Sequence, residues 1–107
     1  MIISTGEHVP GYEIKEVKGP AVGLTVRARG LGKDITASIK GLMGGEIKQY
    51  AEMLEEARKE AMDRMTANAQ QMGADAIIAF RFDSGNISSN MSEIVAYGTA
   101  VTLEKKQ

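Results

Sequence analysis

The stretch GGEIKQYAEMLEEARKEAMDRMTANAQQMG, residues 44–73, decides the fold that the sequence predicts. Apolar residues recur in it at spacings of three and four, the period of one face of an α-helix. This apolar face consists of Met43, Ile47, Tyr50, Ala51, Leu54, Ala57, Ala61, Met65, Ala69 and Met72. Most of the opposite face is charged or amide, and Gly73 is a natural left-handed stop. We therefore predict one long amphipathic helix that ends at Gly73.

Two pairs of opposite charge four residues apart should support this helix. They are Glu55 with Lys59 and Glu60 with Arg64. Met53 and Met62 lie off the main apolar face, where they are either tolerated at its edge or form a second contact surface for another subunit.

Five shorter stretches have the composition or the two-residue alternation of β-strands. They are residues 2–5, 12–17, 21–29, 74–82 and 91–103. We expect a hairpin turn at Lys18-Gly19-Pro20 and another turn over residues 83–86, because both contain residues that favour turns. After the third strand, Asp34 can cap a short helix over residues 35–40.

The alternation within each strand indicates which side chains share a face. In residues 21–29 we expect the aliphatic face to meet the helix, and the face with two arginines to point away from it. The aliphatic face consists of Val22, Leu24, Val26 and Ala28, and the other of Gly23, Thr25, Arg27 and Arg29. In residues 74–82, Ile78, Phe80 and Phe82 share one face, and Ile77, Ala79 and Arg81 share the other.

The last strand, residues 91–103, is fairly apolar on both faces in its middle. A strand of this kind is usually covered on both faces, and one helix covers only one of them. We therefore expect the other face to meet a neighbouring subunit.

The order of strands, one long helix and further strands predicts a two-layer α+β fold, with the helix on a small antiparallel or mixed sheet. A length of 107 residues fits a single domain over residues 1–107. Only 5% of the residues are aromatic and none is Trp, so the core is light and oligomerisation would supplement it.

Composition and charge exclude several classes of partner. The 13 basic and 14 acidic residues give a net charge of −1 without a block of like charge, so we expect no nucleic-acid partner. No apolar stretch approaches the ~18 residues of a membrane-spanning helix, and the N-terminus lacks the features of a signal peptide. We expect a cytoplasmic protein without a membrane partner, and the absence of cysteine fits a reducing compartment.

No constellation of catalytic residues is visible, so we expect a protein that is not an enzyme and uses no cofactor. His8 is the single histidine and lies in a turn-rich loop beside Glu7, where a solvated loop residue is the simplest interpretation. A metal site at His8 would need ligands from elsewhere in the fold.

Two groups of residues are candidates for binding a small ligand. Gly44, Gly45 and Glu46 begin the long helix, where exposed N–H groups favour an anion; alternatively, the glycines permit a tight bend and Glu46 favours the helix N-terminus. The second group comes from strands and consists of Arg27, Arg29, Arg81, Asp83 and Glu93. These residues can form ion pairs across strands or subunits, or line a polar pocket for a small anion, and either arrangement predicts acidic partners near the arginines.

Three segments resemble the YbjQ-like family: VGLTVRARG at 22–30, GGEIKQYAEMLEEAR at 44–58 and GADAIIAFRFD at 73–83. The resemblance spans essentially the whole chain. It implies a bacterial or archaeal protein of uncharacterised function, with a dodecin-like subunit that assembles into a ring-shaped homopentamer. The positions that match the family's pattern are Arg27, Gly44, Gly45, Glu46, Arg58, Arg81 and Asp83.

The family carries a heavy-metal-binding label. This chain has no cysteine and one histidine, so it lacks the soft ligands that heavy metals prefer. Carboxylates such as those of Asp34, Glu46 and Asp83 could bind a hard cation if assembly brought several of them together.

The sequence thus leads to three hypotheses. The first is a non-enzymatic homo-oligomer, a pentamer, that binds a small anion or a metal ion at subunit interfaces. Its candidate ligand-binding residues are Arg27, Gly44, Gly45, Glu46, Arg81 and Asp83. The second is a heavy-metal-binding protein, and the third is an enzyme whose cleft holds carboxylates and arginines with perturbed pKa values.

Overall fold

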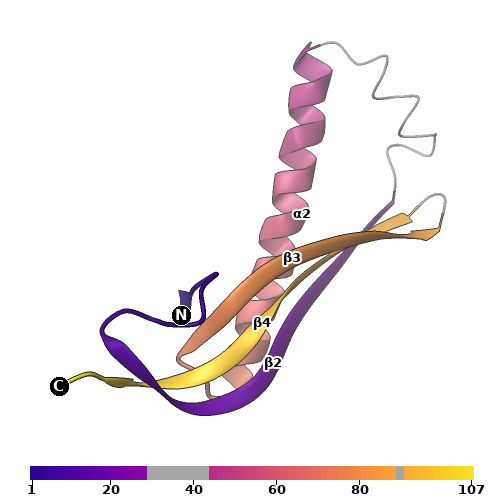
Figure 1. The fold of residues 1–107 in the computed structure, drawn as a ribbon. Coiled ribbons are helices and arrows are strands. Elements are labelled where there is room, and N and C mark those ends of the chain that lie inside the picture. Colours follow the sequence, from indigo (N-terminus) through magenta and orange to yellow (C-terminus); the bar gives the residue numbers. More distant parts are fainter. Residues whose placement is uncertain (29–43, 89–90) are drawn as a thin grey trace.

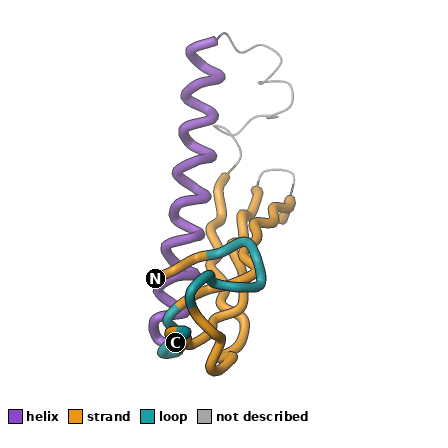
Figure 2. The backbone as a smooth tube through the Cα atoms, turned by 60° about the vertical axis from the view of Figure 1, so that its left-hand side comes forward, coloured by secondary structure: helices purple, strands orange, loops and turns teal. Residues whose placement is uncertain are grey.

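The computed structural model describes residues 1–28, 44–88 and 91–107. The element order is β1 (Ile2–Ile3), β2 (Tyr12–Ala28), α2 (Gly44–Gln71), β3 (Ala76–Ser88) and β4 (Met91–Lys105). The strands form one sheet in the order β1-β3-β4-β2, in which β1 is parallel to β3 and the other pairs are antiparallel. The helix lies on one face of this sheet (Figures 1 and 2). The predicted two-layer α+β fold with a mixed sheet is therefore confirmed.

Helix α2 packs on the sheet with the C-terminal half of its predicted apolar face. Ala57, Ala61, Met65 and Ala69 are fully buried, whereas Leu54 is 40% exposed. The N-terminal end of α2 rises beyond the ends of the strands (Figures 1 and 2), which explains why the apolar face is uncovered there. Among the residues that the structure describes, no helix is long and apolar enough to cross a lipid bilayer.

The helix ends as the sequence predicts. Gly73 has a φ of 79°, and its N–H donates a hydrogen bond to the carbonyl of Gln70 at 3.0 Å. A glycine in this left-handed conformation closes a helix without the clash of a side chain. The predicted short helix over residues 35–40, with Asp34 and Arg29, lies outside the described residues.

The main core between α2 and the sheet is built largely from small side chains. It contains Ala21, Ala57, Ala61, Met65, Ala69, Ile77, Phe80, Ile94, Ala96 and Ala100. At Gly23 the helix backbone lies directly on the sheet, because a Cβ there would collide with the carbonyl oxygen of Ala61 and the backbone nitrogen of Met65. Glycine and alanine on both layers thus allow a close approach of helix and sheet.

The predicted faces of β2 are reversed in the structure. Val22, Leu24 and Val26 are 44%, 42% and 37% exposed, on the side away from α2. Gly23 and Thr25 instead face the helix, and Thr25 is 1% exposed. The prediction was wrong because it ranked the faces by apolarity, whereas the backbone of α2 requires the face with the smaller side chains.

Two predicted turns lie inside strands. Strand β2 continues through Lys18-Gly19-Pro20, where Gly19 has a φ of 126° and the pairing with β4 shifts between Val17 and Gly19. Proline is tolerated in β2 because this strand is at the edge of the sheet, where its missing N–H need not cost a hydrogen bond between strands. Strand β3 likewise continues through residues 83–86, because Asp83 and Gly85 pair with Val95 and Glu93 of β4.

A β-bulge at Ala79 changes which residues of β3 share a face. Ala79 has a φ of 53°, and the pairing with β4 shifts between Ile78 and Arg81. As a result, Ile77 and Phe80 belong to the core under α2, whereas Ile78 packs on the opposite side of the sheet. The predicted grouping of Ile78 with Phe80 was therefore wrong, since an extra residue interrupts the alternation.

The sheet face opposite to α2 is covered by the chain over only part of its length. Val9, in the loop between β1 and β2, is 6% exposed and packs with Ala76, Ile78 and Val101. The preceding segment follows the bulge, since the carbonyls of Ser4 and Gly6 accept hydrogen bonds from the N–H groups of Phe80 and Ala79. This loop covers the half of the face nearest the chain termini (Figure 1).

Candidate ligand-binding site

Arg27 lies between the sheet and α2. Its Nη2 donates to Oε2 of Glu60 at 2.5 Å, and its Nη1 donates to Oγ1 of Thr25 at 3.2 Å. Nη2 of Arg64 lies 2.6 Å from Oε1 of the same glutamate, which confirms the predicted pair within the helix. The predicted acidic partner of Arg27 is confirmed, but the predicted position on the face away from the helix was wrong, because β2 is reversed.

Glu60 is thus held between two guanidinium groups. The hydrogen bond from Arg27 keeps the pKa of Glu60 below its ordinary value, and the positive charges of Arg27 and Arg64 act in the same direction against desolvation. The carboxylate is therefore ionised at neutral pH and neutralises Arg27. Within one chain, Arg27 serves to join the sheet and the helix.

Three residues of α2 at intervals of four form a polar row along the helix: Glu60, Arg64 and Asn68. Nη1 of Arg64 donates to the carbonyl of Leu24 at 2.5 Å, and Nδ2 of Asn68 donates to the carbonyl of Val22 at 2.6 Å. The polar row therefore ties α2 to the outer edge of β2. Sequence reasoning found one pair of this row but missed Asn68, although its spacing of four residues from Arg64 beside the alanine face was a usable signal.

The other predicted helix pair has a different partner. Nζ of Lys59 lies 2.8 Å from Oδ2 of Asp63, four residues further on, rather than beside Glu55. Both side chains of this ion pair are more than 60% exposed, so it contributes little to stability.

Arg81 and Asp83 lie on the face of the sheet away from α2. Arg81 is directly opposite Tyr97, and Asp83 is directly opposite Val95. Nη1 of Arg81 donates to the carbonyls of Thr5 at 2.8 Å and Phe80 at 2.7 Å. The predicted acidic partner of Arg81 is absent from the ion pairs of the described residues.

Gly44, Gly45 and Glu46 are the first three residues of α2, at the end that rises beyond the strands (Figure 1). The six predicted ligand-binding residues therefore lie in three places: at this helix end, under the helix at Arg27, and on the opposite face of the sheet at Arg81 and Asp83. One chain does not bring them together, and their joint role in binding a ligand stays a prediction.

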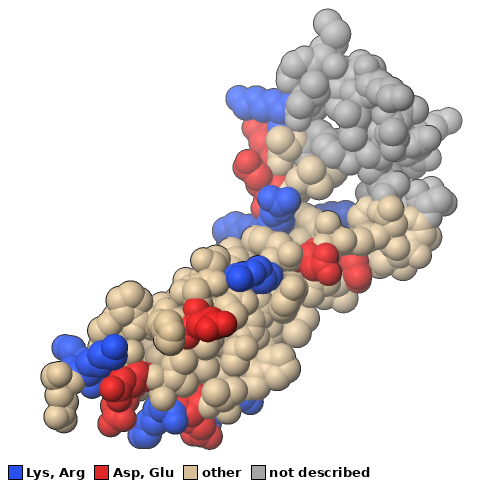
Figure 3. All heavy atoms as spheres, viewed as in Figure 1, with Lys and Arg blue, Asp and Glu red and all other residues tan. Residues whose placement is uncertain are grey.

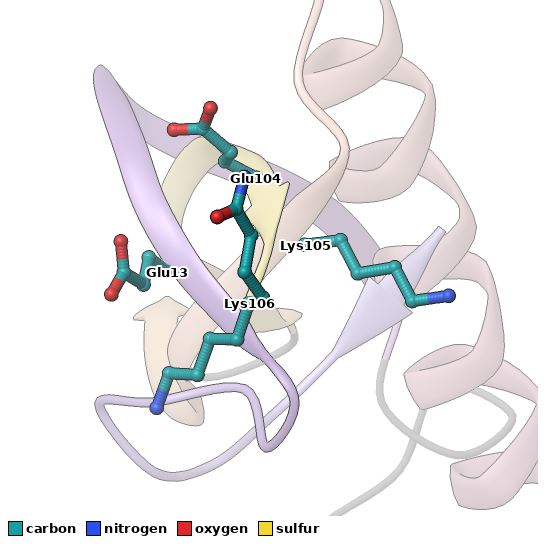
Figure 4. A pocket seen from close by; sticks show the side chains of 5 residues that line it. Glu13, Glu104, Lys105 and Lys106 are labelled. Atoms are coloured by element: carbon teal, nitrogen blue, oxygen red, sulfur yellow. The ribbon is translucent and has the colours of Figure 1, made fainter.

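A surface pocket lies where β2 begins and β4 ends, and it contains none of the predicted residues. It is lined by Glu13, Glu104, Lys105, Lys106 and Gln107. Glu13 and Glu104 are paired across the two strands, while Lys105 extends away from them (Figure 4). Its exposed side chains carry both signs of charge, so the pocket favours neither an anion nor a cation.

The donor atoms of the described residues do not gather at a heavy-metal site. Among the described residues, no group of three or more His, Cys, Asp or Glu side chains is placed to hold a metal ion. His8 is exposed in its loop, and the carboxylates of Glu60 and Asp63 already pair with cationic side chains. A metal site would need donors in addition to those that the described residues bring together.

Comparison with known proteins gives the chain a family. The YbjQ family model, described as "Putative heavy-metal-binding", matches residues 1–104. The chain belongs to this family. The resemblance that the sequence suggested is therefore confirmed, and the function of the family is uncharacterised.

Relatives of this chain occur in archaea as well as bacteria. The chain is 54% identical to the UPF0145 protein SSO1976 of Saccharolobus solfataricus over 98% of this chain and 92% of that protein. It is 56% identical to a UPF0145 protein of Thermotoga petrophila over 98% of this chain and 99% of that protein.

A crystal structure of a protein of unknown function from Pediococcus pentosaceus, assigned to the DUF74 family, has a similar fold. The TM-score is 0.64 at 18% sequence identity, and the match covers 97% of this chain and 98% of that chain. At this identity the match shows the shared fold alone.

Proposed function

We propose that this YbjQ-family chain is one subunit of a cytoplasmic homo-oligomer, a dodecin-like homopentameric ring, and that the ring binds a small ligand or ion between its subunits. In this proposal the protein is not an enzyme. Its ligand site is assembled from residues of neighbouring chains, which is consistent with the scattered positions of the candidate residues in a single chain.

The observation that carries this proposal is the row of large hydrophobic side chains that the single chain leaves exposed on the sheet. Val22, Leu24 and Tyr97 are each more than 40% exposed, on the face opposite to α2. Large apolar side chains that gather on one exposed face are typical of a surface that contacts another protein. A neighbouring subunit would cover them.

The charges of the free sheet face support a small anion as one class of ligand. Two carbonyls hold one nitrogen of the Arg81 guanidinium, and no ion pair of the described residues neutralises it. In a ring, symmetry repeats Arg81 and Asp83 in every subunit. A site between neighbouring subunits can therefore combine candidate residues that lie apart within one chain.

Native mass spectrometry of the purified protein tests both parts of the proposal in one experiment. It reports the number of subunits from the mass of the complex, and any retained ligand as additional non-protein mass. We expect a homopentamer that releases the additional mass when it dissociates into subunits. A protein that is monomeric over the micromolar range would contradict the proposal.

The family description favours heavy-metal binding as a second candidate function. Because no three donor side chains of the described residues gather at such a site, this candidate function places the metal between subunits. Calorimetric titration with zinc, copper, nickel and cadmium, repeated on His8→Ala, tests this candidate. Submicromolar binding by the assembled protein would support it, whereas the absence of binding tighter than about millimolar would exclude it in practice.

A further inference from the structure

We infer that a second copy of this chain packs on the uncovered half of the sheet face opposite to α2. This surface, which we call the apolar strip, consists of Val22, Leu24 and Val26 of β2 with Val95 and Tyr97 of β4. The inference rests on the proposed function, because it names the surface through which subunits of the homo-oligomer meet.

The strand register brings these side chains together. Val22 is directly opposite Tyr97, and Leu24 is directly opposite Val95, so their side chains lie on the same face of the sheet. The exposed fractions are 44% for Val22, 42% for Leu24 and 41% for Tyr97. The apolar strip is thus a continuous patch of large side chains across two central positions of the β2–β4 ladder.

The other half of the same sheet face shows that the chain does not leave such a surface open where it can cover it. There, Val9 packs on Val101 and Ile78 and is itself 6% exposed. No described segment is packed in this way on the apolar strip, where Val22, Leu24, Val26 and Tyr97 stay exposed and Val95 is half-buried. A cover for the strip therefore has to come from outside the described part of the chain.

The charges beside the apolar strip favour a second copy as that cover. Arg81 and Asp83 flank it on β3, opposite Tyr97 and Val95, and Glu93 lies opposite Val26. Figures 1 and 3 view the molecule with β3 in front of α2. In this view uncharged residues cover most of the sheet, and the residues of either charge are scattered rather than gathered into one patch. Two copies of a surface with both signs can pair their charges, whereas an anionic lipid surface or a nucleic acid would require a basic patch.

The free edge of β2 is a less suitable place for a partner. Strand addition at this edge would need the outward carbonyls of Val22 and Leu24, and these accept hydrogen bonds from Asn68 and Arg64 of the polar row. Packing on the face of the sheet leaves those hydrogen bonds intact. The geometry therefore directs association to the face rather than to this edge.

Leu24→Lys and Leu54→Lys form a matched pair of variants for light scattering. Both replace a leucine of nearly equal exposure, 42% and 40%, but Leu24 lies in the apolar strip and Leu54 lies on α2, on the other side of the sheet. For Leu24→Lys we expect light scattering to give the mass of an 11.5 kDa monomer, and the circular-dichroism spectrum to be unchanged. For Leu54→Lys we expect the same mass as for the unmodified protein. Retention of that mass by Leu24→Lys would overturn the inference.

Thiol labelling gives a second readout that does not depend on a disruptive charge. The chain has no cysteine, so Leu24→Cys and Leu54→Cys each introduce a single thiol. With a bulky maleimide we expect the Leu24→Cys protein to react at least about tenfold more slowly than the Leu54→Cys protein, because a neighbouring subunit covers position 24. Equal labelling rates in an assembled protein would overturn the inference, whereas a monomeric unmodified protein would instead overturn the proposed function.

Discussion

Gly23 sets the distance between β2 and α2, because backbone atoms of Ala61 and Met65 occupy the space of a side chain. We expect Gly23→Ala to lower the free energy of unfolding by about 3 kcal/mol, since the helix backbone must move to admit a methyl group. Denaturant unfolding measures this change. The matched control is Gly85→Ala in β3, where the nearest atom lies 4.0 Å away. Equal losses in the two variants would contradict the proposed close approach.

Glu60 should make stability depend on pH. Because its pKa in the folded protein is lowered from 4.5, mainly by the hydrogen bond from Arg27, its contribution is complete above about pH 4.5 and is lost as the pH falls through the folded-state pKa. We expect Glu60→Gln to be less stable than the unmodified protein at pH 7, and this difference to shrink below pH 4.5. Urea unfolding from pH 3 to pH 7 measures it.

Glu52→Gln is the control for the pH experiment, because Glu52 is exposed on α2 and belongs to none of the ion pairs of the described residues. Its stability difference from the unmodified protein should stay small at every pH. A Glu60→Gln difference that does not change with pH would show that the carboxylate charge is not what joins Arg27 to the helix.

At the scale of the element, the bulge at Ala79 decides which side of β3 faces α2. An alanine at a φ of 53° is strained by about 1–2 kcal/mol, which glycine avoids and a β-branched residue increases. We expect Ala79→Val to lower the free energy of unfolding by about 1–2 kcal/mol, and Ala79→Gly to change it by less than about 1 kcal/mol. Thermal unfolding of both variants measures this order, and a valine variant as stable as the glycine variant would contradict the left-handed conformation.

The polar row should protect the edge of β2. We expect the double variant Arg64→Ala with Asn68→Ala to aggregate faster, because the carbonyls of Leu24 and Val22 become available for strand addition. Turbidity and thioflavin fluorescence at 37 °C measure the rate. Lys59→Ala with Gln70→Ala removes two exposed polar side chains of the same helix and should leave the rate unchanged. Similar rates in both double variants would show that Arg64 and Asn68 do not guard this edge.

The elements differ in how well their sequences predict them. A helix repeats its period over 28 residues, so its face and its end at Gly73 follow from the pattern. A strand offers few repeats, and one extra residue at Ala79 reverses its faces. The segments at Gly19 and over residues 83–86 contain residues that favour turns, but both continue as strands because they pair with β4. The sequence did not predict which face of β2 meets α2, because that orientation depends on the close contact between Gly23 and the helix backbone. Only the folded structure shows this contact.

At the scale of the whole molecule, the sequence predicted several candidate site residues but not which residues lie beside them in the fold. Charge and spacing identified Arg27 and its need for an acidic partner, but the partner is a helix residue 33 positions away. Arg81 and Asp83 were placed on a strand, and the register puts them beside the apolar strip. In the proposed oligomer, the number of copies that meet depends on contacts between chains, and the pattern within one chain does not give it.

The mass of the protein in solution tests the central claim, self-association, most directly. We would measure it by light scattering after treatment with a chelator and again after reloading with divalent metals. We predict the same mass in both samples, five subunits of 11.5 kDa or about 58 kDa. An oligomer that forms only with metal would favour the heavy-metal function, and a mass of 11.5 kDa in both samples would contradict the account.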